Sequence, residues 1–195
     1  AWRRLDAPRP VASGRFLSRP GVFAWDRIDA ASALLARHLP DGLQGRAADL
    51  GAGYGYLAAE LLARSPGIVA LDAFEADARA LALARHNLAG FAQRVALGFH
   101  WHDVAAGIPP GYDVVVTNPP FHAPDGRERP DIGRAFIAAA AKALRPGGRL
   151  WMVANRHLPY EQALGEGFGE ARLVAQEAGF KVVEAVRAGR GQGAR

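Results

Sequence analysis

Apolar residues recur along this chain at two spacings, one typical of helices and one of buried strands. Helical spacing marks residues 27–39, 56–64, 77–88 and 132–144. Short, dense apolar runs predict strands at residues 47–50, 68–74, 94–99, 112–117 and 149–154. Strands that alternate with helices in this way indicate a parallel sheet with helices on both faces.

The last part of the chain departs from this alternation. Residues 171–176 and 180–186 flank Glu177-Ala178-Gly179, a turn sequence, so we expect them to pair as an antiparallel hairpin. The predicted fold class is α/β, with a doubly wound, mostly parallel, seven-stranded sheet that ends in this C-terminal hairpin. Such a Rossmann-like sheet resembles the class I methyltransferase fold more than that of a dehydrogenase.

Residues 1–20 mix arginine, proline and polar residues without a helical or strand period, and we expect an extended lead-in there. Residues 21–195 then form one domain, a length that a single core can fill. No apolar run approaches the roughly 20 residues that cross a bilayer, and the first residues lack the hydrophobic stretch of a signal peptide. We therefore expect a cytoplasmic protein with no membrane partner.

Composition restricts the chemistry of the protein. The sequence has no cysteine, which excludes disulfides, thiolate metal sites and any mechanism with a cysteine nucleophile. Its six histidines show no metal-ligand spacing, so we predict no metal. The net charge of +5, with Lys142 and Lys181 the only lysines among 24 basic residues, favours an anionic partner such as RNA or DNA. A nucleotide-composition bias toward arginine explains the same pattern, and both explanations stay open.

A glycine-rich loop follows the first predicted strand of the sheet. Its sequence is Asp49-Leu50-Gly51-Ala52-Gly53-Tyr54-Gly55, and its glycines let the backbone turn sharply and approach a ligand. The spacing differs from the dinucleotide fingerprint, whose third glycine would fall at Tyr56. A carboxylate at the position of Asp49 can hold the ammonium group of a bound amino acid. We interpret the loop as a cofactor site, and a plain tight turn is the alternative.

Acidic residues follow the next two strands. An acid after the second strand can accept hydrogen bonds from both ribose hydroxyls of an adenosyl group, and the candidates are Asp72 and Glu75. We favour Glu75, because Asp72 lies within the apolar run. After the third strand, His102-Asp103-Val104 is a candidate segment to bind adenine, with Asp103 accepting from its amino group, and an ordinary loop acid is the alternative.

The most specific signal is Asn118-Pro119-Pro120-Phe121, directly after the most hydrophobic strand. Two prolines fix the backbone and remove two donors, so the local carbonyls can face a ligand. An exocyclic NH2 could donate to the Asn118 side-chain oxygen and the Pro119 carbonyl, which would aim its lone pair at a methyl sulfonium. Phe121 is suited to stack on a planar base, as an unstacked nucleotide requires. The motif predicts N-methylation with S-adenosyl-L-methionine, and a Pro-Pro loop beside a core phenylalanine is the alternative.

Two features near this motif have open roles. His122 could contact substrate phosphate, but a loop histidine is more often only solvated, so it is left out of the catalytic set. The polar segment 123–130 could be a lid that touches RNA or merely a connection.

These motifs resemble a known family, the bacterial small-subunit ribosomal RNA guanine-N2 methyltransferases of the RsmC type, which carry a methyltransferase small domain. The resemblance spans residue 20 to the terminal hairpin. Its most discriminating part is Ala154-Asn155 with Leu158-Pro159-Tyr160. Its other parts are Pro20-Gly21-Val22-Phe23, Asp26 to Asp29, the glycine loop, and Asn118 to His122.

The resemblance implies methylation of the guanine exocyclic amine in small-subunit (16S) ribosomal RNA, with ribosomal RNA or the small ribosomal subunit as partner. It implies that Asn118, Pro119, Pro120 and Phe121 form the active-site loop. It also implies a cofactor site formed by Phe23, Asp49, Gly51, Ala52, Gly53, Glu75, Asp103, Val104 and Asn118. Family members usually carry an additional amino-terminal domain that helps bind RNA, and we expect that such a domain is missing here.

Four other functions remain open. A protein-glutamine methyltransferase or a DNA adenine-N6 methyltransferase would use a similar loop on a similar NH2 group. Phe121 and His122 weigh against the first, and Leu158-Pro159-Tyr160 weighs against the second. A non-catalytic RNA-binding module should lose the cofactor glycines or Asn118, both of which are present. A nicotinamide dehydrogenase gains nothing from the Asn-Pro-Pro loop.

Overall fold

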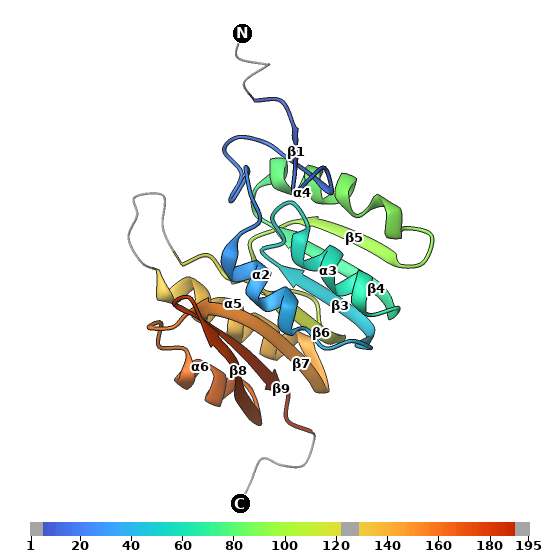
Figure 1. The fold of residues 1–195 in the computed structure, drawn as a ribbon. Helices are drawn as coiled ribbons and strands as arrows, with labels where there is room; N and C mark the ends of the chain where they lie inside the picture. Colours follow the sequence, from blue (N-terminus) through green and yellow to red (C-terminus); the bar gives the residue numbers. More distant parts are fainter. Residues whose placement is uncertain (1–5, 122–128, 190–195) are drawn as a thin grey trace, which may run out of the picture.

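The computed structural model describes residues 6–121 and 129–189. A seven-stranded sheet runs through the middle of the protein, in the order β5-β4-β3-β6-β7-β9-β8 (Figure 1). Its strands are β3 (Gln44–Leu50), β4 (Gly67–Glu75), β5 (Ala96–Trp101), β6 (Tyr112–Thr117), β7 (Leu144–Asn155), β8 (Glu170–Glu177) and β9 (Phe180–Val186). Strands β5, β4, β3, β6 and β7 pair in parallel, and β9 pairs antiparallel with both β7 and β8.

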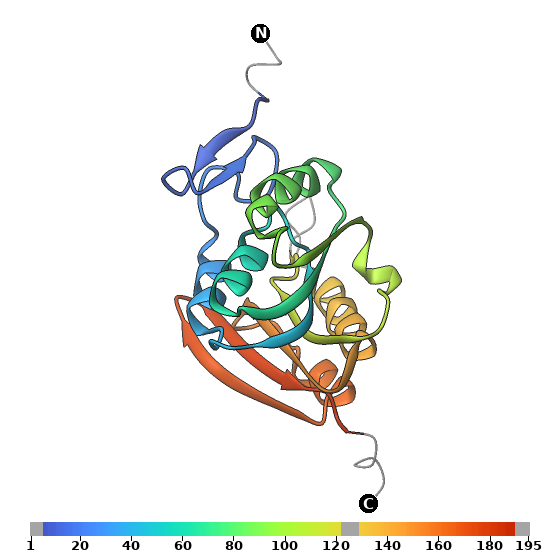
Figure 2. The same ribbon diagram turned by 90° about the vertical axis from the view of Figure 1, so that its right-hand side faces the viewer.

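Helices cover both faces of this sheet (Figure 2). They are α2 (Ala30–His38), α3 (Tyr56–Arg64), α4 (Ala78–Asn87), α5 (Pro130–Ala143) and α6 (Glu161–Gly167), with short 3-10 turns η1 (Ala89–Phe91) and η2 (Val104–Ala106). The predicted α/β class, the parallel sheet and the C-terminal antiparallel hairpin are confirmed. Ala178 and Gly179, the two residues between β8 and β9, both have positive φ, as a tight hairpin turn requires.

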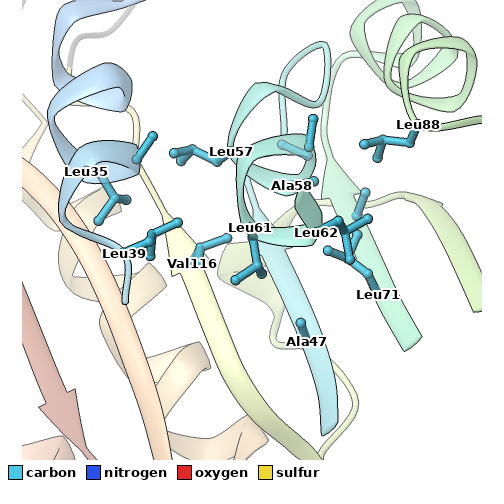
Figure 3. Close-up of a cluster of buried hydrophobic side chains, with 14 of the residues drawn as sticks. Leu35, Leu39, Ala47, Leu57, Ala58, Leu61, Leu62, Leu71, Leu88 and Val116 are labelled. Carbon is cyan, nitrogen blue, oxygen red and sulfur yellow. The ribbon is translucent and has the colours of Figure 1, made fainter. Parts of the chain in front are cut away.

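The period-two alternation of the strands divides the core into two layers. Ala47 of β3 and Val116 of β6 face α2, α3 and α4, while Ala48 and Val115 face α5. Figure 3 shows leucines of α2 and α3 over the first of these faces. Both faces of the central strands are therefore buried, which explains why these strands are continuous apolar runs in the sequence.

Several boundaries differ from the expected ones. Helix α2 begins at Ala30 rather than residue 27, because the Asp29 carboxylate caps it by accepting from the Ser32 N–H at 2.8 Å. Strand β7 starts at Leu144, five residues before the apolar run that predicted it. Helix α6 was not predicted, since its seven residues are few for a recognisable helical period.

Residues 9–18 lie within the segment that we expected to be an extended lead-in, and they form two short strands. Strands β1 (Arg9–Val11) and β2 (Phe16–Ser18) form an antiparallel hairpin, and Val11 and Phe16 are buried in the main core. Three-residue strands are too short to show alternation. Their turn also puts Ala12 and Ser13 at positive φ, which these residue types rarely adopt. The domain division at residue 20 stays a prediction.

The side chain of Asn87, at the end of α4, holds this hairpin in place. It accepts from the Leu17 N–H at 2.8 Å and donates to the carbonyls of Leu17 and Tyr54 at 2.9 and 2.8 Å. Because Tyr54 belongs to the glycine loop, the hairpin and the loop share one anchor.

Among the helices of the described residues, none is long and apolar enough to cross a membrane.

Candidate active site

The site lies at the edge of the sheet where the parallel strands end. Leu50 of β3 is level with Phe74 of β4 and Thr117 of β6, so the segments that follow these strands meet. Strand β4, the next strand in the chain, pairs with β3 on one side, and the later strand β6 pairs with β3 on the other side. The strand order therefore reverses at β3. This switch point is where open α/β sheets bind ligands.

A cavity of about 410 Å³ opens at this edge. It is lined by the predicted residues Phe23, Gly51, Gly53, Glu75, Asp103, Val104, Asn118, Pro119, Pro120 and Phe121. Ala52 lines a smaller adjoining cavity of about 50 Å³, which also includes Asp29 and Ser32. Asp49 is fully buried beneath the glycine loop. The structure therefore gathers ten of the predicted residues around one cavity, whereas Ala52 lines the adjoining cavity and Asp49 lines neither.

The glycine loop is tightly folded, and of its three glycines only Gly53 borders open space. Gly51 has a φ of +72° and a side chain there would meet the Phe136 ring at 3.3 Å. Gly55, at +91°, packs against the backbone of Ala84, which a side chain would approach to 3.2 Å. At Gly53 an added Cβ would meet nothing within 4 Å. The bare backbone at Gly53 therefore borders open space, as close approach to a ligand requires.

Asp49 is a buried acid with spare hydrogen-bonding capacity. Its Oδ2 accepts from the Ala58 N–H at 3.0 Å, and its Oδ1 has no hydrogen-bond partner among the described residues. Burial raises the pKa of Asp49 to about 7, against the lowering effect of the Ala58 hydrogen bond. A cationic group within reach of Oδ1 would give this oxygen a hydrogen-bond partner and would stabilise the ionised form of the Asp49 carboxyl.

Glu75 and Asp72 have different surroundings. Glu75 ends β4 and lines the cavity, with one carboxylate oxygen accepting from Gly53 N–H and the other from Asp77 N–H, both at 2.8 Å. Each of its oxygens keeps a second lone pair for a ligand hydroxyl. Asp72 does not line the cavity. Of these two acids, Glu75 is therefore the one placed to meet a ligand in the cavity.

Asp72 instead holds together a polar cluster on the sheet. Its carboxylate accepts from Arg46 at 2.6 Å and from the Tyr112 hydroxyl at 2.8 Å, and lies 2.9 Å from a ring nitrogen of His100. Burial raises the pKa of Asp72, but the hydrogen bonds to His100, Arg46 and Tyr112 outweigh it and the pKa is lowered. Asp72 thus has a structural role.

The loop after β5 forms the far wall of the cavity. The Asp103 carboxylate accepts from the Ala105 N–H at 2.9 Å and caps the short turn that contains Val104. Trp101, 74% exposed, donates from its indole N–H to the Ala76 carbonyl at 2.8 Å. His102, part of the predicted adenine segment, also lines the cavity. Sequence reasoning missed four further lining residues, Phe74, Ala76, Ile132 and Phe136. All four are apolar, and nothing in the sequence distinguishes them from core residues.

Asn118 is tied to the start of α2. Its side-chain NH2 donates to the Asp29 carboxylate and to the Ser32 hydroxyl, both at 2.9 Å. The neighbouring Thr117 hydroxyl donates to the Leu50 carbonyl at 2.7 Å, which fixes the end of β6 against β3. His122 and most of the segment 123–130 lie outside the described residues. Arg129, where the description resumes, donates its backbone N–H to the Phe121 carbonyl at 2.8 Å.

The Leu158-Pro159-Tyr160 segment packs in the core and not at the cavity. Leu158 and Tyr160 are buried in the core layer beneath α5 and do not line the cavity. Tyr160 fills the place of a side chain at Gly133, where an added Cβ would lie 1.9 Å from the phenol oxygen. Lys181 of β9 donates to the Leu158 carbonyl at 2.8 Å and holds the segment to the hairpin.

Among the described residues, no three His, Asp or Glu side chains come together in a way that could hold a metal ion. The site therefore consists of backbone donors, carboxylates, an amide and aromatic rings.

The sheet order and a glycine loop at the switch point define a class I methyltransferase fold. Solved structures share it: mitomycin 7-O-methyltransferase MmcR is 20% identical, with a TM-score of 0.63 over 81% of this chain and 53% of that one. The model of the methyltransferase small domain matches residues 13–184. The chain belongs to the methyltransferase small domain family.

Relatives of this chain are named as ribosomal RNA methyltransferases. Ribosomal RNA small subunit methyltransferase C of Alcanivorax borkumensis is 38% identical over 182 residues, which are 90% of this chain and 53% of the relative. Ribosomal RNA large subunit methyltransferase G of Streptomyces coelicolor is 39% identical over 189 residues, 91% of this chain and 48% of the relative. The resemblance to RsmC-type proteins is confirmed, and the chain spans about half the length of these relatives.

A solved structure of such a relative is similar over most of this chain. The 16S rRNA N2 methyltransferase RsmC of T. thermophilus, in complex with AdoMet and guanosine, is 32% identical. Its TM-score is 0.74, and the match covers 93% of this chain and 50% of that chain.

Proposed function

We propose that this chain transfers a methyl group from S-adenosyl-L-methionine to the exocyclic N2 amine of a guanine in small-subunit (16S) ribosomal RNA. The observation that carries the proposal is a single cavity with two kinds of lining. The glycine loop and Glu75 line it together with Asn118 to Phe121. A cofactor site and an amine-binding loop thus share one space.

The residues present fit S-adenosylmethionine. The unpartnered Oδ1 of Asp49 suits the ammonium group of its amino acid part, and the open backbone at Gly53 allows close approach. Glu75 would accept from the ribose hydroxyls, and Asp103 with Val104 would hold the adenine. Phe23, 64% exposed and on the rim of both cavities, would cover the bound molecule. When bound, S-adenosylmethionine supplies an electrophilic methyl group on its sulfonium.

The Asn118 loop would orient the nucleophile. The Asn118 side-chain oxygen and the Pro119 carbonyl accept the two protons of the guanine amine, which turns the nitrogen lone pair toward the methyl group. The nitrogen would take the methyl group as the carbon–sulfur bond of the sulfonium breaks and a neutral thioether leaves. It would then lose one proton to water, so no general base is needed. Positive charge that develops on the amine would be stabilised by the two acceptors.

Aromatic and basic residues would hold the RNA. Phe121 lines the cavity beside the exposed Pro120 and is suited to stack on a guanine that has left its helix. The arginine-rich surface and net charge of +5 favour the phosphate backbone. Since the matched relatives are about twice as long as the matched region, we propose that an additional RNA-binding domain contributes to target choice in the cytoplasm.

Large-subunit ribosomal RNA is the second candidate substrate. It is favoured by the relative from Streptomyces coelicolor, which is as similar to this chain as the small-subunit relative is. The same cavity and the same chemistry serve both RNAs, so the distinction rests on surfaces outside the cavity.

Titration calorimetry with S-adenosylmethionine, with NADH as control, tests the cofactor assignment. We expect binding of the first compound only. Incubation with separated 16S and 23S RNA, followed by mass spectrometry of the nucleosides, tests the substrate. N2-methylguanosine in 16S RNA supports the proposal, and the same product only in 23S RNA moves it to the large subunit. Cofactor binding without methylation of either RNA contradicts the proposed substrate.

A further inference from the structure

The side-chain NH2 of Asn118 donates both of its protons to residues at the start of α2. One acceptor is Oδ2 of Asp29 and the other is Oγ of Ser32, each 2.9 Å from the Asn118 nitrogen. A side-chain NH2 has two protons to give, so this pair of contacts uses its full donor capacity. Asn118 and Asp29 are 89 residues apart in the sequence, and only the fold brings them together.

This arrangement decides which way the Asn118 amide points. An ionised carboxylate accepts hydrogen bonds and cannot donate, so a flipped amide would bring its oxygen against the oxygens of Asp29. The NH2 group therefore faces α2, and the side-chain oxygen is left to accept from a substrate. Donation to an anionic acceptor also polarises the amide and makes its oxygen a stronger acceptor.

Asp29 is itself held firmly. The same Oδ2 accepts from the Ser32 N–H at 2.8 Å, and the Asp29 carbonyl accepts from the Ala33 N–H at 2.9 Å. Just before it, the Arg27 carbonyl accepts from the hydroxyl of Tyr54 in the glycine loop at 3.1 Å. The segment that leads into α2 is thus anchored to the glycine loop, which borders the cavity.

We propose that Asp29 and Ser32 are positioning residues for methyl transfer, which act by fixing the orientation and polarity of the Asn118 amide. This inference rests on the proposed function of the same site. It assigns a role in the reaction to the residues that begin α2, and they need not touch either substrate to fill it.

A lost N-cap would by itself destabilise α2, so the variants separate capping from positioning. Asp29→Ser keeps a side chain that caps helices well but is too short to reach Asn118. Asp29→Asn offers an amide oxygen in place of the carboxylate and restores the acceptor. Asp26→Ala is the matched control, because Asp26 is an exposed acid on the same segment that pairs with Arg27.

The readouts are kcat, the KM for RNA and the Kd for S-adenosylmethionine. We expect Asp29→Ser to lower kcat about 10- to 100-fold, as a misplaced catalytic group does. The KM and Kd should stay within about threefold, Asp29→Asn should regain most of the lost rate, and Asp26→Ala should match the wild type. A kcat of Asp29→Ser within about twofold of wild type overturns the proposal. So does a weakened cofactor affinity with unchanged kcat, which would make Asp29 a cofactor ligand.

A second measurement does not depend on activity. Hydrogen exchange of the Asn118 side-chain NH2, followed by nuclear magnetic resonance and assigned with Asn118→Ala, reports its two hydrogen bonds. We expect slow exchange in the wild type and fast exchange in Asp29→Ser. If the wild type transfers no methyl group, the proposed function fails, and exchange still decides this inference. Equal protection in both proteins overturns it.

Discussion

The carboxylate of Glu75 accepts a 2.8 Å hydrogen bond from the backbone N–H of Gly53, which joins the end of β4 to the glycine loop. The same carboxylate also accepts from Asp77 N–H, at the start of α4. One side chain therefore joins the glycine loop to the start of α4 and still offers lone pairs to a ligand.

Replacement of Glu75 should weaken cofactor binding. We expect Glu75→Gln to raise the Kd for S-adenosylmethionine about tenfold, since one acceptor of the pair becomes a donor. Calorimetry measures this directly. Asp72→Asn is the matched control: it lies outside the cavity lining, so it should lower the melting temperature and leave the Kd unchanged. A Kd that responds to Asp72 and not to Glu75 would reverse the assignment.

Cofactor affinity should depend on the ionisation of Asp49. Because burial raises the pKa of Asp49 to about 7, this carboxyl is mostly neutral at pH 5.5 and about half ionised at pH 7. Only the ionised form attracts an ammonium group, and a ligand amino group stays charged below about pH 7.7. Affinity should therefore rise roughly tenfold from pH 5.5 to 7. Asp49→Asn should bind more weakly with a flat pH profile, and an unchanged profile would exclude this role.

Removal of the Asn118 side chain should affect the chemical step. We expect Asn118→Ala to lower kcat by about 100-fold or more, the usual effect of losing a group that acts mainly in the transition state. Its Kd for S-adenosylmethionine should stay near that of the wild type. Single-turnover methyl transfer and calorimetry measure the two quantities separately. Wild-type turnover in this variant would rule out the role of Asn118.

The amino-terminal hairpin should depend on Asn87. The Asn87→Ala variant loses three hydrogen bonds to Leu17 and Tyr54, so we expect a loss of about 2–3 kcal/mol in the free energy of unfolding. Backbone hydrogen exchange at Leu17 should become faster. Gln93→Ala, at an exposed position, serves as the control. A hairpin that stays protected in Asn87→Ala would show that its apolar contacts suffice.

A side chain at Gly133 should destabilise the protein. Alanine usually stabilises a helix relative to glycine, but here its Cβ would lie 1.9 Å from the Tyr160 oxygen. We expect Gly133→Ala to lower the free energy of unfolding by about 1–3 kcal/mol, the cost of overpacking. Thermal unfolding measures it, and the added substitution Tyr160→Phe should recover part of the loss. A gain in stability would contradict the packing described for α5.

Long periodic segments were predictable from the sequence, and short or capped ones were not. The helix over residues 56–64 and the strand over residues 112–117 have the expected bounds. In contrast, the hairpin of residues 9–18 is hydrogen-bonded to Asn87, a contact that no local pattern reveals. Element type follows from the local period, whereas element ends and short strands follow from tertiary hydrogen bonds.

The candidate site was likewise only partly predictable from the sequence. Gly51, Glu75 and Asn118 directly follow or end strands, and parallel strands bring their carboxyl ends together, so their grouping follows from the sequence. The contact of Asn118 with Asp29 and Ser32 joins two segments that are about 90 residues apart in the chain, and nothing in either segment points to the other.

The most direct test of the account is mass-spectrometric analysis of the nucleosides of 16S RNA after incubation with the purified chain and S-adenosylmethionine. The account predicts N2-methylguanosine, formed by the wild type and strongly reduced with Asn118→Ala. Unmodified RNA, or a methyl group on any atom other than the guanine amine, would contradict it.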